Sequence, residues 1–400
     1  MDLVVAHTIA LLGVALLVAI AARRLRLPYT VGLAIAGVAL AIAKVETGET
    51  LTHDFIFDII LPPLLFEAAL SIHWRELKRD LAPVLVLSTL GVVVSAAVVA
   101  VGMTRLLGWP FGSALVFGAL IAATDPVAVI AMFKDARVKG RLRLVVETES
   151  LFNDGVAAVM FALVLTWAQA TTAGAPTAAE TARALAVMTG GGLAVGLLCG
   201  AGGIAIAGRS FDHLVETGLT VVVAYGSFLI AERFRFSGVL ATVAAGMLMG
   251  NRGLLREDPR WGFSPHGRTF IVAFWDFAAF VANSLIFLLI GSAVADIPFS
   301  TVGATGLAAA IALVLAGRLL TVYPLCLLFL WSRWAIPLGE QHVLWWGGLR
   351  GALALALALA LPPDLPLRDE ILVAAFGVVA FSVIAQGLTM PLLLRRLGFL

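Results

Sequence analysis

Six ionisable side chains lie within long apolar stretches of this sequence, namely Glu67, Asp125, Glu149, Asp154, Arg318 and Arg350. An ionisable side chain near the centre of a bilayer costs roughly 2.5 to 3.5 kcal/mol, so each one indicates a partner or a function. Like charges in a medium of low dielectric constant favour protonation of one of them. Because the acids outnumber the bases, we expect at least one carboxylate to hold a proton or a bound cation.

The segment 147–155 reads Glu-Thr-Glu-Ser-Leu-Phe-Asn-Asp-Gly. On a helix, Ser150 and Asp154 lie on one face, and Glu149 and Asn153 occupy the neighbouring stripe. A hydroxyl stacked on a carboxylate suits a small hard cation, which binds several oxygens. We favour a functional role for Asp154 with Asn153, because nothing forces so costly a pair into a membrane span.

Two further oxygens could complete such a site. Glu67 lies late in an apolar stretch, and a helix break would free the carbonyl of Thr124 as a ligand. Glu67 could instead mark the end of a span, and Asp276 is expected at the membrane interface rather than in the site. We therefore predict a sodium-sized ion bound by Asp154, Ser150, Glu67 and Thr124.

The other buried charges also have a structural interpretation. Asp125 and Arg350 could compensate helix ends, with the carboxylate against exposed amides and the guanidinium against exposed carbonyls. Glu149 and Arg318 could form an ion pair that holds two helices together, and we prefer this interpretation for them.

The elements that position these residues are membrane-spanning helices. The chain has 400 residues, of which 61% are hydrophobic and 13% are charged, whereas an ordinary soluble domain carries about a quarter charged residues. This composition excludes a soluble enzyme and predicts an all-α membrane protein. Hydropathy, with charged, Pro or Gly residues between segments, predicts about thirteen transmembrane helices. Their expected limits are 2–21, 28–44, 54–72, 82–107, 111–133, 146–169, 182–208, 213–232, 236–250, 270–295, 302–331, 341–361 and 370–394.

The basic residues indicate how the chain is oriented. Most lysines and arginines lie in the odd-numbered connectors and in the C-terminal tail. The positive-inside rule then places the N-terminus outside and the C-terminus in the cytoplasm. We expect a multi-pass protein of a bacterial inner (plasma) membrane.

Thirteen spans imply two six-helix inverted repeats. A first repeat at about 1–169 and a second at about 213–394 would be separated by a linker helix at about 182–208, so equivalent helices run in opposite directions. The fifth and twelfth spans are then partners, and each carries helix breakers: Thr124-Asp125-Pro126 in one and Gly347-Gly348-Leu349-Arg350-Gly351 in the other. Two discontinuous helices at matching positions predict a binding site.

Other classes of site have little support in the sequence. Cys199 and Cys326 lie far apart in apolar spans, and no two histidines have metal-ligand spacing. No ATP motif is present. We expect a single polytopic unit over 1–400 that has no soluble domain, catalytic residue or cofactor and does not bind nucleic acid.

These motifs resemble those of the monovalent cation/proton antiporters of the NhaP type, prokaryotic relatives of the animal sodium/proton exchangers. The resemblance rests on Ala-Thr-Asp-Pro-Val-Ala-Val at 123–129, Glu-Ser-Leu-Phe-Asn-Asp-Gly at 149–155, Phe-Val-Ala-Asn-Ser-Leu-Ile-Phe at 280–287, Gly-Arg at 317–318 and Gly-Gly-Leu-Arg-Gly-Ala at 347–352. They are spread over most of the chain in the order of the family.

The resemblance implies a homodimeric scaffold and a mobile core, with core elements at about 82–169 and 302–394. It implies that Asp154 is the ion- and proton-binding carboxylate, with Asn153 beside it. It further implies that Ser150, Glu67 and the Thr124 backbone complete the ion shell. Asp125 would support the crossing of the two broken helices, and Arg350 would serve the second of them. Glu149 would pair with Arg318.

The function implied is secondary-active exchange of Na⁺ or Li⁺ for H⁺ across the lipid bilayer by alternating access. Family members with Asn-Asp at this place tend to exchange one ion for one proton electroneutrally. A K⁺/H⁺ antiporter of the same fold stays open as an alternative, because the motifs do not determine ion size. From another class, a cation channel or a sensor that binds the ion without moving it also stays open, although the sequence shows neither acidic rings nor a carbonyl filter.

Overall fold

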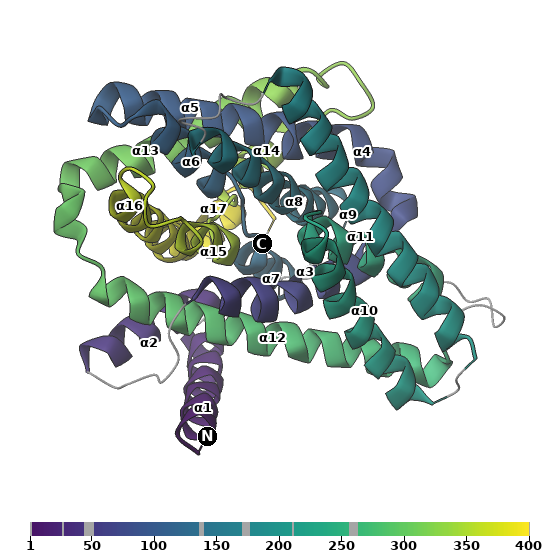
Figure 1. The fold of residues 1–400 in the computed structure, drawn as a ribbon. Coiled ribbons are helices and arrows are strands. Elements are labelled where there is room, and N and C mark those ends of the chain that lie inside the picture. The colour runs from purple at the N-terminus through teal and green to yellow at the C-terminus, as the bar shows by residue number, and fades with distance from the viewer. Residues whose placement is uncertain are drawn as a thin grey trace.

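The computed structural model describes residues 2–25, 28–43, 52–135, 140–169, 177–209, 212–255 and 263–399. In this part of the chain all regular structure is helical (Figure 1). The first half contains α1 (Asp2–Leu25), α2 (Tyr29–Ile42), the π-helical turn η1 (Phe55–Ile60), α3 (Leu61–Ser71), α4 (Trp74–Ser88), α5 (Leu90–Leu107), α6 (Phe111–Ile121), α7 (Val127–Asp135) and α8 (Arg141–Gln169).

The second half begins with the long helix α9. It contains α9 (Ala178–Ala207), α10 (His213–Arg233), α11 (Gly238–Met249), η2 (Gly250–Leu254), α12 (Pro265–Asp296), η3 (Phe299–Thr301), α13 (Gly303–Leu327), α14 (Leu338–Trp346), α15 (Ala352–Leu359), α16 (Arg368–Phe381), η4 (Ser382–Gln386) and α17 (Gly387–Arg396). In Figure 1, α7, α15 and α17 lie near the centre, α9 to α11 lie on one side, α13 and α16 lie on the other, and α12 runs along one edge.

Long apolar helices make this a multi-pass membrane protein. Among the described residues, seven helical stretches have the length and composition to cross a bilayer: Trp74–Leu107, Arg141–Gln169, Ala178–Ala207, His213–Arg233, Pro265–Ala295, Gly303–Leu327 and Arg368–Arg396. A bilayer core of about 30 Å requires roughly 20 helical residues. The shorter apolar helices include Tyr29–Ile42 and Phe111–Ile121.

The predicted segments overlap helices of the structure, but three of these helices begin five or more residues before the predicted limit, at Trp74, Arg141 and Pro265. The segment predicted from residue 82 begins at Trp74, because the polar residues before the apolar run are also helical. The helix departs from helical backbone angles at Asp80 (φ −114°, ψ 17°). Hydropathy placed the start where the apolar run starts, and it therefore missed this polar turn.

Two consecutive prolines alter the third predicted segment. Pro62 and Pro63 lie at the start of α3, directly after the π-helical turn η1. Proline has no N–H, so the carbonyl four residues before it loses its helical donor. The carbonyl of Ile59 instead accepts a hydrogen bond of 3.0 Å from the hydroxyl of Tyr225 on α10. This bond ties α10 to the start of α3.

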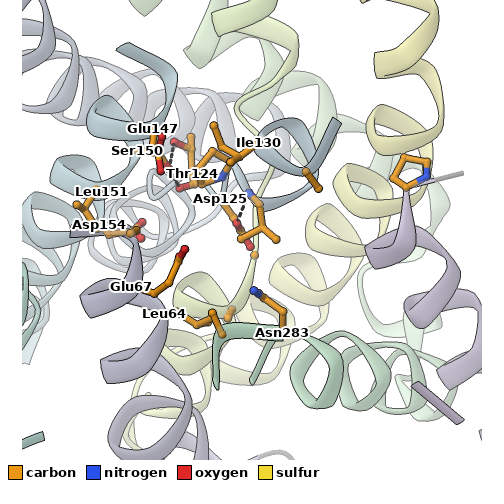
Figure 2. A pocket seen from close by; sticks show the side chains of 18 of the residues that line it. Leu64, Glu67, Thr124, Asp125, Ile130, Glu147, Ser150, Leu151, Asp154 and Asn283 are labelled. Atoms are coloured by element: carbon orange, nitrogen blue, oxygen red, sulfur yellow. Dashed lines mark hydrogen bonds between the residues drawn. The ribbon is translucent and has the colours of Figure 1, made fainter. Parts of the chain in front are cut away.

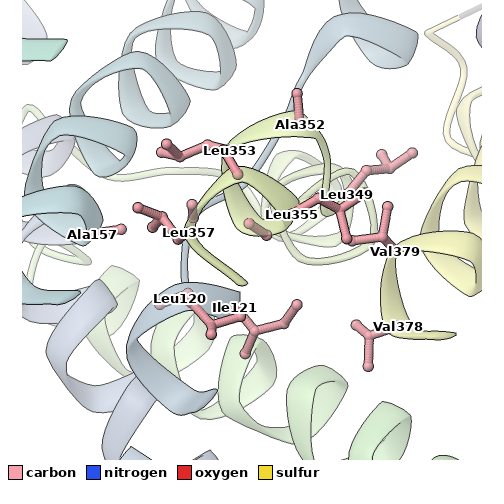
Figure 3. Packing of buried hydrophobic residues seen from close by; sticks show 14 of the residues in the cluster. Leu120, Ile121, Ala157, Leu349, Ala352, Leu353, Leu355, Leu357, Val378 and Val379 are labelled. Atoms are coloured by element: carbon pink, nitrogen blue, oxygen red, sulfur yellow. The ribbon is translucent and has the colours of Figure 1, made fainter. Parts of the chain in front are cut away.

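The centre of the molecule is built around α15. Every residue of Ala352–Ala358 is buried, as expected for a helix that is apolar on all sides. Figure 3 shows Leu349, Leu355 and their neighbours packed among Leu120 and Ile121 of α6 and Val379 of α16. The second broken helix therefore lies inside the protein rather than against lipid.

Helices α2 and α12 approach each other closely through two glycines. A Cβ on Gly37 would collide with the carbonyl of Leu288, and a Cβ on Gly291 would collide with the carbonyl of Ala34. Small residues allow such backbone contacts between membrane helices. At the other end of the pair, the rings of Tyr29 and Phe280 stack with their centroids 6.0 Å apart. These contacts hold α12 in a defined register against α2.

Candidate functional site

The two helix interruptions lie where the sequence predicted them, and they face each other. The break between α6 and α7 lies against the break between α14 and α15. The N–H of Asp125 donates a hydrogen bond of 2.7 Å to the carbonyl of Leu349. Backbone that leaves the helix at membrane depth is tolerated only inside protein or along a cavity. This bond satisfies one N–H of the first break and one carbonyl of the second.

Two charged side chains satisfy the helix ends at the breaks. Arg350 Nη1 donates to the carbonyls of Ala122 at 2.7 Å and Ala123 at 2.8 Å, at the C-terminal end of α6. Asp125 Oδ1 accepts a hydrogen bond of 2.9 Å from the N–H of Val127, at the start of α7. Each charge has the sign that complements the helix dipole at its position. Asp125 and Arg350 thus have the geometry of helix-end compensation.

Gly351 makes this crossing possible. A Cβ on this residue would collide with the carboxyl group of Asp125. The carboxylate of the first broken helix therefore lies directly beside the start of α15. A side chain at position 351 would push the two broken helices apart.

Helix α8 holds the unwound segment through Thr124. Ser150 Oγ donates to the carbonyl of Thr124. Asn153 Oδ1 accepts a bond of 3.1 Å from the Thr124 N–H, and Asn153 Nδ2 donates to the Thr124 hydroxyl. All three residues are buried. Asn153 replaces the helical partners that Thr124 lost at the break, which satisfies buried backbone groups.

A bidentate ion pair connects α8 with α13. Arg318 Nη1 and Nη2 donate to Glu149 Oε1 and Oε2 at 2.8 and 2.9 Å. Arg318 Nη2 also donates to the carbonyl of Leu344 at 3.1 Å, in the last turn of α14. Glu149 and Arg318 are only 2% and 6% exposed. This pair joins three helices at the rear of the site.

A cavity of about 1200 Å³ opens in front of this framework. The predicted site residues among those that line it are Glu67, Thr124, Asp125, Ser150 and Asp154. Figure 2 shows the carboxyl groups of Asp154, Glu67 and Asp125 directed towards the same space. Within the described ranges, no residue forms an ion pair or a hydrogen bond with Asp154. Its charge faces the cavity rather than lipid or a permanent basic partner.

Comparisons with known proteins agree with this geometry. Residues 11–396 match the family described as sodium/hydrogen exchanger, transmembrane. The chain belongs to this family. The exchanger is 41% identical over 391 residues to the Na(+)/H(+) antiporter ApNhaP of Aphanothece halophytica, covering 97% of this chain and 73% of the relative. It is 34% identical to the Na(+)/H(+) antiporter NhaP of Pseudomonas aeruginosa, covering 94% of this chain and 92% of the relative.

A solved structure of the same fold covers the whole exchanger. The sodium proton antiporter MjNhaP1 of Methanocaldococcus jannaschii aligns with a TM-score of 0.76 over 99% of each chain, at 21% sequence identity. This match shows that the two chains share a fold.

The cavity of the exchanger also has polar residues to which the sequence analysis gave no role in the site. Tyr29, Glu147, Asn283 and Arg395 line it, and so does Asp276, which was expected at the interface. Asn283 was visible as a polar residue in the apolar stretch 280–287. Periodicity could not reveal it as part of the cavity, because the facing helices are remote in sequence.

Proposed function

We propose that the chain is a secondary-active antiporter that exchanges Na⁺ or Li⁺ for H⁺ across a bacterial plasma membrane. The observation that carries the proposal is Asp154, a carboxylate within α8 that faces a cavity and has no basic partner among the described residues. Such a group can hold either a proton or a cation, but not both. The family and the names of the relatives support the same activity.

The ion shell we propose consists of Asp154, Ser150, Glu67 and the carbonyl of Thr124. All four residues line the cavity. The Ser150 hydroxyl donates to the Thr124 carbonyl, yet each oxygen keeps a lone pair for a cation. Oxygen ligands of this kind suit a small hard cation. Asn153 and Asp125 hold the unwound segment in place, and Glu149, Arg318 and Arg350 support it through their ion pair and backbone contacts.

Alternating access would result from movement of the core against the scaffold. We assign the elements at about 82–169 and 302–394 to the core, and the rest of the chain to a scaffold that forms a homodimer. The cavity extends from the broken helices to Arg395 in the last turn of α17 and to Phe399 beyond that helix. The positive-inside rule makes this side cytoplasmic. His53 lies at the end of the second predicted connector, which the same rule would place outside, and its Nδ1 is 2.9 Å from the carbonyl of Ala356 on α15. This contact would have to break for the site to open outward.

The thirteen-span inverted repeat belongs to the same proposal. The two broken helices, α6–α7 and α14–α15, occupy the positions that the fifth and twelfth spans would take. Inverted repeats place such helices at the substrate site of secondary transporters.

Liposomes with the purified protein test the proposed activity. We expect a pulse of Na⁺ or Li⁺ to dissipate a preset pH gradient, with an apparent affinity roughly tenfold or more above that for K⁺, a difference of about 1.4 kcal/mol. Equal or stronger dissipation by K⁺ would establish the K⁺/H⁺ alternative. Cation binding without any dissipation would indicate a sensor, and a current that does not depend on a proton gradient would indicate a channel.

Exchange of one Na⁺ for one H⁺ moves no net charge, so the rate should depend little on membrane voltage. A cycle that moved one net charge would change its driving force by about 2.3 kcal/mol per 100 mV, which corresponds to roughly 50-fold in equilibrium. We therefore expect nearly equal Na⁺-driven proton fluxes when the potential is clamped with K⁺ and valinomycin at different values. A steep voltage dependence would contradict electroneutral exchange.

A further inference from the structure

One polar side chain faces the cavity from the wall opposite the broken helices. Asn283 lies on α12, lines the cavity and is only 7% exposed. Figure 2 shows Asn283 reaching towards the space onto which Glu67 and Asp125 also point. Its place on α12 puts it outside the core elements that carry Asp154.

The amide of Asn283 has no protein partner within the described part of the chain. An amide has two N–H donors and an oxygen with two lone pairs. A buried polar group without a hydrogen bond costs about 1 to 3 kcal/mol. This cost is offset only if the amide bonds to something inside the cavity, which is water or the transported cation.

The surrounding contacts hold Asn283 in position. One turn earlier on α12, the ring of Phe280 stacks on Tyr29 of α2. Further along, Gly291 touches the backbone of α2 so closely that a Cβ would not fit. The amide is therefore presented from a fixed helix, and a fixed ligand loses little entropy when it binds.

The charges around the cavity indicate what a neutral oxygen does there. Five acids already line the cavity, namely Glu67, Asp125, Glu147, Asp154 and Asp276. A further acid would strengthen the binding of protons as well as of cations. An amide oxygen adds a ligand for a cation that loses its water shell, without adding a site for a proton.

We propose that Asn283 is a specificity-determining residue whose amide oxygen binds the cation in the cavity and so favours Na⁺ over H⁺. This role rests on the proposed antiport function. In this role α12, a helix of the proposed scaffold, supplies an oxygen that replaces a water ligand of the ion as the ion moves towards Asp154. Loss of the oxygen therefore weakens the binding of Na⁺ and leaves proton binding unchanged.

The test compares variants of Asn283 in proteoliposomes, with Na⁺-driven proton flux as the readout. Asn283→Leu keeps the size of the side chain and removes its oxygen. We expect the KM for Na⁺ to rise about tenfold, as for a lost bond to a charged group. The maximal rate and the proton concentration that gives half-maximal rate should stay within about twofold. Asn283→Asp keeps the oxygen and adds a charge, so both Na⁺ and protons should bind more tightly and turnover should slow.

The matched control is Ser284→Ala, at the next position of the same helix. Ser284 is buried and does not line the cavity, so this variant should transport like the wild type. A folded Asn283→Leu protein with unchanged KM overturns the role of Asn283. If that variant does not fold, Asn283→Val also removes the oxygen, and an unchanged KM for Na⁺ in Asn283→Val overturns it. A wild-type protein without any Na⁺-driven flux would instead overturn the proposed function.

Discussion

Replacement of Asp154 by asparagine is expected to reduce Na⁺-driven proton movement to the level of protein-free liposomes. The carboxyl group faces the cavity and is the proposed binding group for both ions. Asparagine keeps its size and one oxygen but can neither release a proton nor carry a negative charge. Both halves of the exchange cycle are therefore lost together. The measurement is dissipation of a pH gradient after a Na⁺ pulse.

The same chemical change at the edge of the cavity is the matched control for Asp154. Asp276→Asn removes a carboxylate from an exposed position on α12 that also lines the cavity. This variant should keep most of the wild-type flux. Surviving Na⁺-driven proton movement in Asp154→Asn would remove that residue from the mechanism.

Replacement of Arg318 by alanine is expected to lower the folded yield far more than the apparent Na⁺ affinity. The guanidinium holds both carboxylate oxygens of Glu149 and the carbonyl of Leu344 in a buried position. Removal of one partner leaves a buried charge unpaired, which costs about 3 to 5 kcal/mol. Thermal unfolding in detergent, followed by size-exclusion chromatography, measures the loss.

Two further variants separate the Arg318 ion pair from general effects of charge removal. The double variant Glu149→Gln with Arg318→Met leaves no stranded charge, so it should be more stable than Arg318→Ala. Arg143→Ala removes the partner of Glu147 in a partly exposed pair at 3.6 Å and should change stability by less than about 1 kcal/mol. A well-folded Arg318→Ala protein with altered affinity alone would contradict the structural role.

The sequence alone was sufficient to predict the membrane class, the approximate positions of the helical segments and the two helix breaks that meet at the site. These properties are local, because a run of apolar residues favours a spanning helix wherever it occurs. Likewise, Pro126 removes a backbone donor and Gly351 has no Cβ regardless of what surrounds them. The third segment shows the limit of this reasoning. The sequence shows Pro63, but the tertiary structure supplies Tyr225 as the donor to the carbonyl of Ile59, which this proline leaves without its helical donor.

Periodicity also grouped Ser150 with Asp154 on one face of α8, and both line the cavity. It could not show that Asn153 turns towards Thr124 on the first broken helix. Nor could it show that Asn283 faces the same space from α12. Helical spacing relates residues within one helix, whereas a site is built between helices that meet only on folding. The sequence thus determined which polar residues share one face of a helix, and the tertiary structure alone decided which helices bring such residues to the same cavity.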